Sequence, residues 1–162
     1  DYNKDDCNII KTYQMYRLDS LDELKDDFSF IKKNNIFLAP KLVRGAYWHS
    51  EYKNNHLYIN KSDCDNNYKK GILECYKNNN NYNLLATHNK ESIQLGLELN
   101  NKEIFQFANL MGMNEKNIDK IAENQKKFTT ATYIPYGNYR EMIPYLSRRL
   151  YENMDSIKYI FK

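Results

Sequence analysis

The sequence predicts an α/β protein in which helices cover a parallel sheet. Two observations support this fold class: five short apolar segments alternate with segments of helical periodicity, and polar residues follow four of the five apolar segments. Strands that alternate with helices form parallel sheets. Such a sheet is either open and doubly wound or closed into a barrel. No GxGxxG follows the first strand and no GxxxxGK[ST] occurs in the chain, so the phosphate-binding glycines of common open-sheet folds are missing.

The first predicted strand covers residues 9–13, where apolar residues prevail. The pattern Ser20-Leu21-Asp22-Glu23 matches a capping box, in which serine and glutamate side chains bond free N–H groups at a helix start. A helix is expected to follow to about residue 33, because apolar residues recur at helical spacing. Its apolar face contains Leu21, Leu24, Phe28 and Ile31.

Four further strand–helix units complete the pattern. The remaining strands are short apolar segments at residues 37–43, 84–87, 104–108 and 130–134. The remaining helices are expected at residues 68–77, after Asn89, near residues 117–126 and at residues 141–153. Asn89 is a favourable N-cap residue, and Ile93, Leu97 and Leu99 are apolar positions of the helix that it begins.

Composition excludes several functional classes. The chain has 162 residues, which indicates one domain, and its 24 Lys and Arg against 21 Asp and Glu give a formal charge of +3. This balance does not indicate nucleic acid or an anionic membrane as an obligatory partner. Hydrophobic residues make up 41% and aromatic residues 14%, which excludes a wholly disordered chain. No apolar run approaches the roughly 18 residues of a membrane span.

The ends of the chain and its cysteines indicate its context. The amino terminus lacks the charged and apolar regions of a signal peptide and lacks an initiator Met, so we expect the chain to be part of a longer one. Three cysteines without a CxxC spacing indicate free thiols in a reducing compartment, rather than a disulfide scaffold or a four-cysteine zinc site.

Asparagine is over-used along the chain. A tract occupies residues 78–81, and doublets occur at residues 34–35, 54–55, 66–67 and 100–101. Because asparagine runs bury no apolar area, they are expected in loops or at helix ends. We assign no function to them.

Charged, aromatic and hydrogen-bonding residues follow four of the predicted strands. They lie at residues 44–48, 87–89, 110–113 and 133–137. Barrel enzymes build their active sites at the carboxyl ends of parallel strands. Four such groups in register favour an active-site rim.

Single members of this rim also have ordinary structural explanations. His88 between Thr87 and Asn89 is compatible with a helix-capping loop that contains a satisfied imidazole. The histidines show no ligand spacing such as HExxH, so no metal site is predicted. Arg148 and Arg149 are compatible with a solvated helix face. Adjacent helical arginines also point about 100° apart, so one of them can face inward and bind a carboxylate.

Six short motifs occur in a fixed order. They are residues 12–16 (TYQMY), 41–48 (KLVRGAYW) with Glu51 following, 86–89 (ATHN), 110–113 (LMGM), 133–137 (YIPYG) and 144–153 (PYLSRRLYEN). Each motif alone is weak, but the ordered set resembles the proline dehydrogenase family specifically. The lysine-before-arginine order in the second motif is similar to that of eukaryotic members.

The resemblance implies a flavin-binding (βα)8 barrel, which is a TIM-barrel-like α/β fold. It begins at what corresponds to strand four of the family barrel and continues through the last helix, so about five of the eight units are expected. Residues 1–162 would therefore form a partial barrel domain whose N-terminal strands are missing, since a whole barrel needs about 250 residues. No family role is assigned to the Asn-rich residues 54–83.

The resemblance also implies an activity, the FAD-dependent oxidation of L-proline to 1-pyrroline-5-carboxylate in proline catabolism, by hydride transfer to the flavin. Arg148 and Arg149 match the paired arginines that bind the substrate carboxylate. Tyr47, Leu110 and Tyr133 match residues packed around the substrate ring. A fixed anion clamp with bulky walls suits a small zwitterion.

The cofactor implied by the resemblance is FAD. Lys41 and Arg44 match residues that meet the flavin ring and the cofactor phosphates, and Trp48 matches an aromatic residue against the cofactor. The other matched cofactor positions are Gln14, Gly45, Ala46, Thr87, His88, Asn89 and Glu152. Flavin supplies the redox chemistry, so no protein nucleophile is required.

Family resemblance further implies a mitochondrial location of eukaryotic type, a quinone electron acceptor and, with it, peripheral membrane association. Two alternatives remain. One is a non-catalytic barrel remnant or interaction protein that has lost the N-terminal half of the site, and the other is a flavin barrel with a different substrate. Tyr133, Leu110, Arg148 and Arg149 favour the enzyme, because a remnant is expected to lose its substrate clamp first.

Overall fold

The computed structural model describes residues 3–4, 7–45, 56–78, 82–100, 103–111 and 129–152, without the side chains of residues 110, 129 and 148–152. The elements in chain order are β1 (Ile10–Gln14), α1 (Ser20–Asn34), β2 (Ala39–Val43), α3 (Lys61–Lys77), β3 (Asn83–Ala86), α4 (Lys90–Leu99), β4 (Phe105–Leu110), β5 (Thr129–Tyr133) and α6 (Tyr139–Glu152). The chain divides into two compact units, residues 1–132 and 133–162.

A five-stranded sheet in the order β1-β2-β3-β4-β5 forms the centre of the first unit. The register pairs β1 with β2, β2 with β3 and β3 with β4 in parallel. Tyr13 lies opposite Leu42, Leu42 opposite Leu85, and Leu85 opposite Phe107. These four buried side chains form one row across four strands. The predicted α/β class with a parallel sheet is confirmed.

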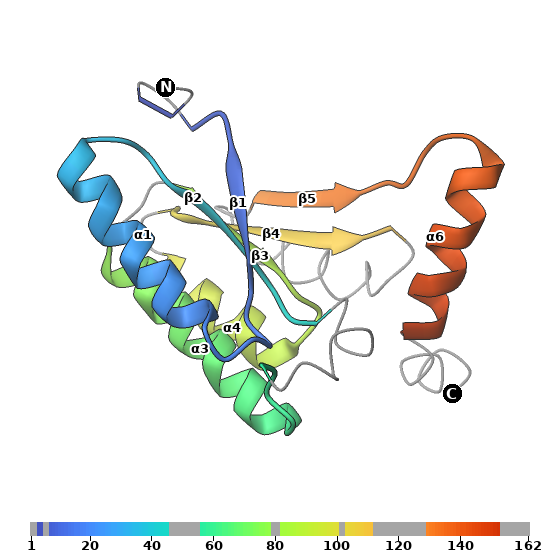
Figure 1. Cartoon of the computed structure of the whole chain (residues 1–162), viewed down its shortest axis with the longest axis horizontal. Coiled ribbons are helices and arrows are strands. Elements are labelled where there is room, and N and C mark those ends of the chain that lie inside the picture. Colours follow the sequence, from blue (N-terminus) through green and yellow to red (C-terminus); the bar gives the residue numbers. More distant parts are fainter. Residues whose placement is uncertain are drawn as a thin grey trace. The chain divides into compact units, whose positions relative to one another are not determined.

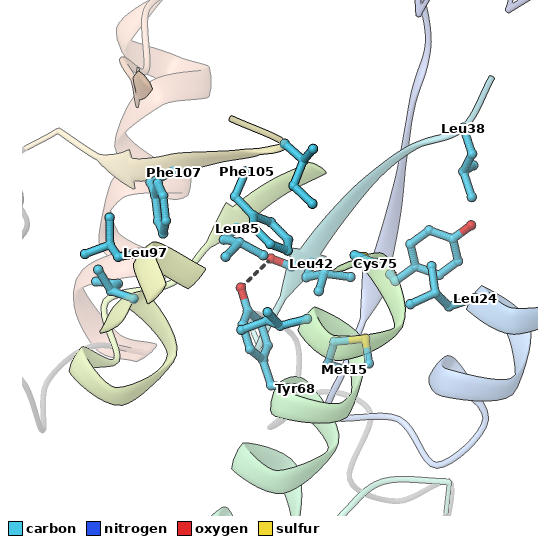
Figure 2. Close-up of a cluster of buried hydrophobic side chains, with 14 of the residues drawn as sticks. Met15, Leu24, Leu38, Leu42, Tyr68, Cys75, Leu85, Leu97, Phe105 and Phe107 are labelled. Carbon is cyan, nitrogen blue, oxygen red and sulfur yellow. Dashed lines mark hydrogen bonds between the residues drawn. The ribbon is translucent and has the colours of Figure 1, made fainter. Parts of the chain in front are cut away.

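Helices α1, α3 and α4 lie together on one side of strands β1 to β3 (Figure 1). The core between the sheet and these helices is a single cluster (Figure 2). Its members are Tyr13, Met15, Leu24, Phe28, Leu38, Leu42, Tyr68, Ile72, Cys75, Leu85, Ile93, Leu97, Ile104, Phe105 and Phe107. Tyr68 brings a hydroxyl into this core and donates it to the Leu42 carbonyl at 3.1 Å, so this buried hydroxyl is paired.

Helix α4 packs very close to the sheet at Gly96. A Cβ atom added at Gly96 would meet Leu85 Cδ1 at 2.6 Å and the Phe107 ring at 3.0 Å. A side chain at this position would force the buried Leu85 and Phe107 side chains to move. The glycine therefore sets the distance between α4 and strands β3 and β4.

Most predicted elements are confirmed. All five strands are present, with bounds that shift by a few residues, and α1, α3, α4 and α6 correspond to four of the predicted helices, although α3 begins earlier than predicted. Asn89 caps α4, since its side-chain oxygen accepts a hydrogen bond from the Ser92 backbone N–H at 2.9 Å. The helix predicted near residues 117–126 lies outside the described residues.

The predicted capping box at the start of α1 is wrong. The N-cap residue is Asp19, and its side chain makes no capping hydrogen bond. Ser20 Oγ instead donates to the Arg17 carbonyl at 2.8 Å. Glu23 lies 2.9 Å from Lys11 Nζ on the neighbouring strand, an ion pair that draws its carboxylate away from the helix start. Contacts from outside the helix thus override the local pattern.

The treatment of the asparagine runs is wrong at one place. Asn35 and Asn100 lie at the C-caps of α1 and α4, as predicted. However, α3 begins at Lys61 rather than at residue 68, so the doublet Asn66-Asn67 lies inside a helix. Tertiary contacts made by one member of the doublet explain why an asparagine run is tolerated there.

Asn67 is buried, with 2% of its surface exposed. Its side-chain N–H group donates to the Met15 carbonyl at 2.9 Å and to Ser20 Oγ at 3.0 Å. These bonds join α3 to the end of β1 and to the start of α1. The neighbouring Asn66 is exposed, so the two members of one doublet have different structural roles.

We expect Asn67→Ala to lower the free energy of unfolding by about 1–3 kcal/mol, because it removes the buried partner of Met15 and Ser20. Asn66→Ala is the matched control and should be neutral or stabilise by a few tenths of a kcal/mol, since alanine favours an exposed helix position. Chemical unfolding of both variants measures the difference. Equal effects at the two positions would contradict the assigned role of Asn67.

Three further findings concern the described part of the chain. The described cysteines form no disulfide, and Cys75 is buried. In the segments that the structure describes, no helix is long and apolar enough to cross a membrane. Within the same segments, no group of three or more His, Cys, Asp or Glu side chains is placed to hold a metal ion.

Candidate functional site

Polar residues from three neighbouring strands meet where the strands end. We call this row of carboxyl-terminal strand ends the carboxyl edge of the sheet. Gln14 is the last residue of β1 and lies opposite Val43, the last residue of β2. Arg44 directly follows Val43, and Thr87 directly follows β3. Because the strands are parallel and in register, these chain ends lie side by side. The structure therefore brings Gln14, Arg44 and the loop after β3 to one edge.

Arg44 is the centre of this edge. Its Nε–H donates to Thr87 Oγ1 at 2.8 Å. One terminal nitrogen forms a salt bridge with Asp65 of α3, and the other donates to Ser92 Oγ of α4. Four segments of the chain thus converge on one guanidinium group.

The guanidinium of Arg44 also lies over an aromatic ring. Its carbon is 4.4 Å from the ring centre of Tyr68, a cation–π distance. Burial lowers the pKa of Arg44 from its ordinary value, but a guanidinium remains charged in a protein. A sheltered charge is tolerated only with partners, and Asp65 and Tyr68 supply them.

The loop after β3 is shaped by its own side chains. Thr87 is buried. Its Oγ1 accepts two hydrogen bonds, one from Arg44 Nε–H and one from the Asn89 backbone N–H at 3.1 Å. Asn89 in turn caps α4. The loop is therefore anchored at both ends, with His88 between two fixed neighbours.

His88 carries an unusual imidazole. Its Nδ1 atom is buried and receives no hydrogen bond from the described residues. Burial lowers the pKa of His88 below its ordinary value. The neutral imidazole is therefore favoured, with one enclosed nitrogen available to a hydrogen-bonding ligand.

Three other predicted cofactor residues near this edge are described by the structure. Lys41 lies in β2, opposite Thr12 and Leu84, and is partly buried. Gln14 is also partly buried and accepts a hydrogen bond from the Tyr16 hydroxyl. Gly45 follows Arg44 and is exposed. Tyr47, Ala46 and Trp48 lie outside the described residues.

The predicted substrate residues lie mostly in the second unit, residues 133–162. Tyr133 ends β5, is 54% exposed and packs near Tyr145, with ring centres 6.2 Å apart. Helix α6 contains Arg148, Arg149 and Glu152, and the structure describes their backbone but not their side chains. Leu110 is the last residue of β4, in the first unit, and its side chain is likewise undescribed. Their roles in binding remain predictions.

Sequence reasoning did not identify the three residues that surround Arg44, namely Asp65, Tyr68 and Ser92. A signal was present for two of them. Asp65, Tyr68 and Ile72 are spaced i, i+3 and i+7, which puts them on one helix face. An arginine directly after an apolar strand requires an anion, and an acidic residue on the core-facing side of the next helix is the natural source.

A parallel sheet whose carboxyl edge carries a fixed arginine and a capped polar loop is the arrangement in which α/β barrel enzymes bind their ligands. Comparison with known proteins narrows this class. The family model of proline dehydrogenase matches residues 1–159. The chain belongs to the proline dehydrogenase family.

Similar proteins share this assignment. The chain is 32% identical to mitochondrial proline dehydrogenase 1 of Dictyostelium discoideum, over 94% of the chain and 30% of that protein. It is 33% identical to mitochondrial proline dehydrogenase 2 of Arabidopsis thaliana, over 93% of the chain and 35% of that protein. A crystal structure of a bifunctional proline utilization A protein superposes with a TM-score of 0.84 at 26% identity, covering 93% of the chain and 16% of that protein. The chain thus spans about a third of the length of these curated relatives.

The His88 environment predicts a pH dependence of stability. With the folded pKa below the ordinary value of about 6.5, the unfolded chain binds more protons between the two values. The free energy of unfolding should therefore rise with pH through this window and level off above about pH 6.5.

Unfolding measured between pH 5 and 7.5 tests this prediction. His88→Gln should remove the rise, whereas His56→Gln, which removes an exposed imidazole, is the matched control. An unchanged profile in His88→Gln would show that the buried imidazole is not its source.

Proposed function

We propose that this chain forms the carboxyl-terminal part of a proline dehydrogenase, which oxidises L-proline to 1-pyrroline-5-carboxylate with FAD as the electron acceptor. The observation that supports this most directly is the convergence of Arg44 with the Thr87–Asn89 loop at the carboxyl edge, in a chain of this family. Both belong to motifs that match cofactor positions of the family.

The proposed domain is a partial barrel over residues 1–162. The described part of the chain contains five strands, and eight are needed to close a barrel of this type. The curated relatives extend well beyond the aligned part, which covers about a third of their length. On this proposal, the remaining strands supply the rest of the active site.

The described residues fit a flavin nucleotide. Arg44 donates three of its five N–H groups to described acceptors, which leaves two for a phosphate group. The enclosed Nδ1 of His88 has no partner among the described residues, as expected where a ligand completes the site. Lys41 would add a positive charge beside the ring system. Bound FAD supplies the electron-accepting chemistry, so the protein needs to bind, orient and exclude water.

The substrate would be held by the residues that match the substrate positions of the family. Arg148 and Arg149 of α6 would bind the proline carboxylate, with Tyr133, Leu110 and Tyr47 against its ring. A guanidinium fork matches a carboxylate in a bidentate geometry. Trp48, Gln14, Gly45, Ala46 and Glu152 would complete the cofactor contacts.

The cellular context follows from the relatives. The relatives from Dictyostelium and Arabidopsis are named mitochondrial, and we extend this location to the present protein. A lipid-soluble quinone would accept the electrons, with the protein at the membrane surface.

The first test is cofactor binding. We expect the protein, with all barrel strands supplied, to bind FAD non-covalently and show flavin absorbance, and to release the flavin on denaturation. A correctly folded but colourless protein would favour the barrel remnant over the enzyme.

The second test concerns the substrate clamp. Arg148→Met and Arg149→Met should each lower kcat/KM for L-proline by roughly 10- to 150-fold, because a charge-assisted hydrogen bond contributes about 1.5–3 kcal/mol. Arg149→Lys should restore only part of the loss, since an ammonium lacks the planar fork. Arg140→Met, at the exposed start of α6, is the matched control. Near-normal kcat/KM in both methionine variants would contradict the clamp and would indicate that Arg148 and Arg149 lie on an ordinary solvated helix face.

A further inference from the structure

Helix α3 begins in the Asn-rich part of the chain, and one of its residues reaches the candidate site. Asp65 lies one turn after the helix start and pairs with Arg44. Its other oxygen is 3.4 Å from Lys61 Nζ. Because Lys61 is 87% exposed and Arg44 only 21%, solvent screens the lysine contact far more strongly. Arg44 is therefore the principal partner of Asp65.

The contacts around Arg44 fix its guanidinium in position and in orientation. Three side chains each accept a hydrogen bond from a different nitrogen of the group, namely those of Thr87, Asp65 and Ser92. The guanidinium carbon lies over the Tyr68 ring, 4.4 Å from its centre. Three hydrogen bonds together with this ring contact leave the planar fork little freedom to rotate.

Asp65 itself is held by a packed element. Tyr68 follows it by three residues on the same helix, is fully buried, and is hydrogen-bonded to the carbonyl of Leu42. Leu42 lies two residues before Arg44 in β2. Asp65 thus lies on α3 and Arg44 directly follows β2, and the hydrogen bond of Tyr68 joins these two elements.

We propose that Asp65 is a positioning residue, which holds the Arg44 fork so that its two remaining N–H groups are presented to a phosphate group of the flavin nucleotide. The inference rests on the proposed function and adds to it a residue outside all the recognised motifs. Asp65 acts through Arg44 and touches no ligand itself. Binding then depends on a fixed geometry, because the pair carries little net charge with which to attract an anion.

The experiment compares two ligands that differ in their phosphates. FAD and riboflavin share the flavin ring, but riboflavin has no phosphate group. In the protein with all barrel strands supplied, Asp65→Ala should weaken FAD binding about tenfold and leave riboflavin binding unchanged. Asp65→Asn should restore FAD binding to within about threefold, since an amide oxygen still accepts from Arg44. Asp63→Ala removes an exposed carboxylate from the first turn of the same helix and is the matched control.

Three results would overturn the proposal. Equal losses for FAD and riboflavin in Asp65→Ala would indicate a general structural defect. Tighter FAD binding would identify Asp65 as a competing anion, and unchanged binding would leave it without a role at the site. A second measurement needs no cofactor: the NMR signal of the Arg44 Nε–H should be protected from exchange in the unliganded protein and in Asp65→Asn, and lose protection in Asp65→Ala.

This measurement separates the two proposals. If the wild-type protein binds no FAD, the proposed function fails whatever the variants show. Continued protection of the Arg44 signal in Asp65→Ala would then reject the positioning role as well. If the wild-type protein binds FAD, failure of the positioning role alone appears as an Asp65→Ala variant that keeps full affinity.

Discussion

The row of buried side chains Tyr13, Leu42, Leu85 and Phe107 is the constraint on which the rest of the first unit depends. A slip of one residue in any strand would turn its apolar members to the opposite face of the sheet, so burial against three helices fixes the register. The same register determines where each strand ends. Arg44 follows Leu42 by two residues and therefore projects to the side that the helices cover.

This placement explains why polar residues lie between the strand ends and the helices, as well as in the loops that follow the strands. A charge set two positions beyond an apolar row has to be compensated where it lies. Asp65, Tyr68 and Ser92 come from the two helices that pack against that row. The core and the candidate site are therefore one continuous structure, in which the last apolar layer is followed directly by a charged one.

The sequence allowed the elements to be predicted much better than the contacts between them. Strand and helix positions follow from local periodicity, and the Asn89 cap from a preference that acts within three residues. The ion pair of Lys11 with Glu23 and the pairing of Arg44 with Asp65, 21 residues away, depend on the register and on which face the helices cover. Neither is encoded in a short window, which is why the capping box at Ser20 was wrong and why Asp65 was not identified.

Asn100 is an asparagine whose side chain takes the place of a backbone hydrogen-bonding partner. Its side chain accepts from the Phe105 backbone N–H at 2.8 Å and donates to the Phe105 carbonyl at 3.3 Å, so it acts as a short piece of strand beside the start of β4. Asn100 is also the C-cap residue of α4. Replacing its amide would remove both hydrogen bonds to Phe105 at once. One side chain thus ends a helix and holds the beginning of the next strand, so a change at this helix end would also disturb the sheet.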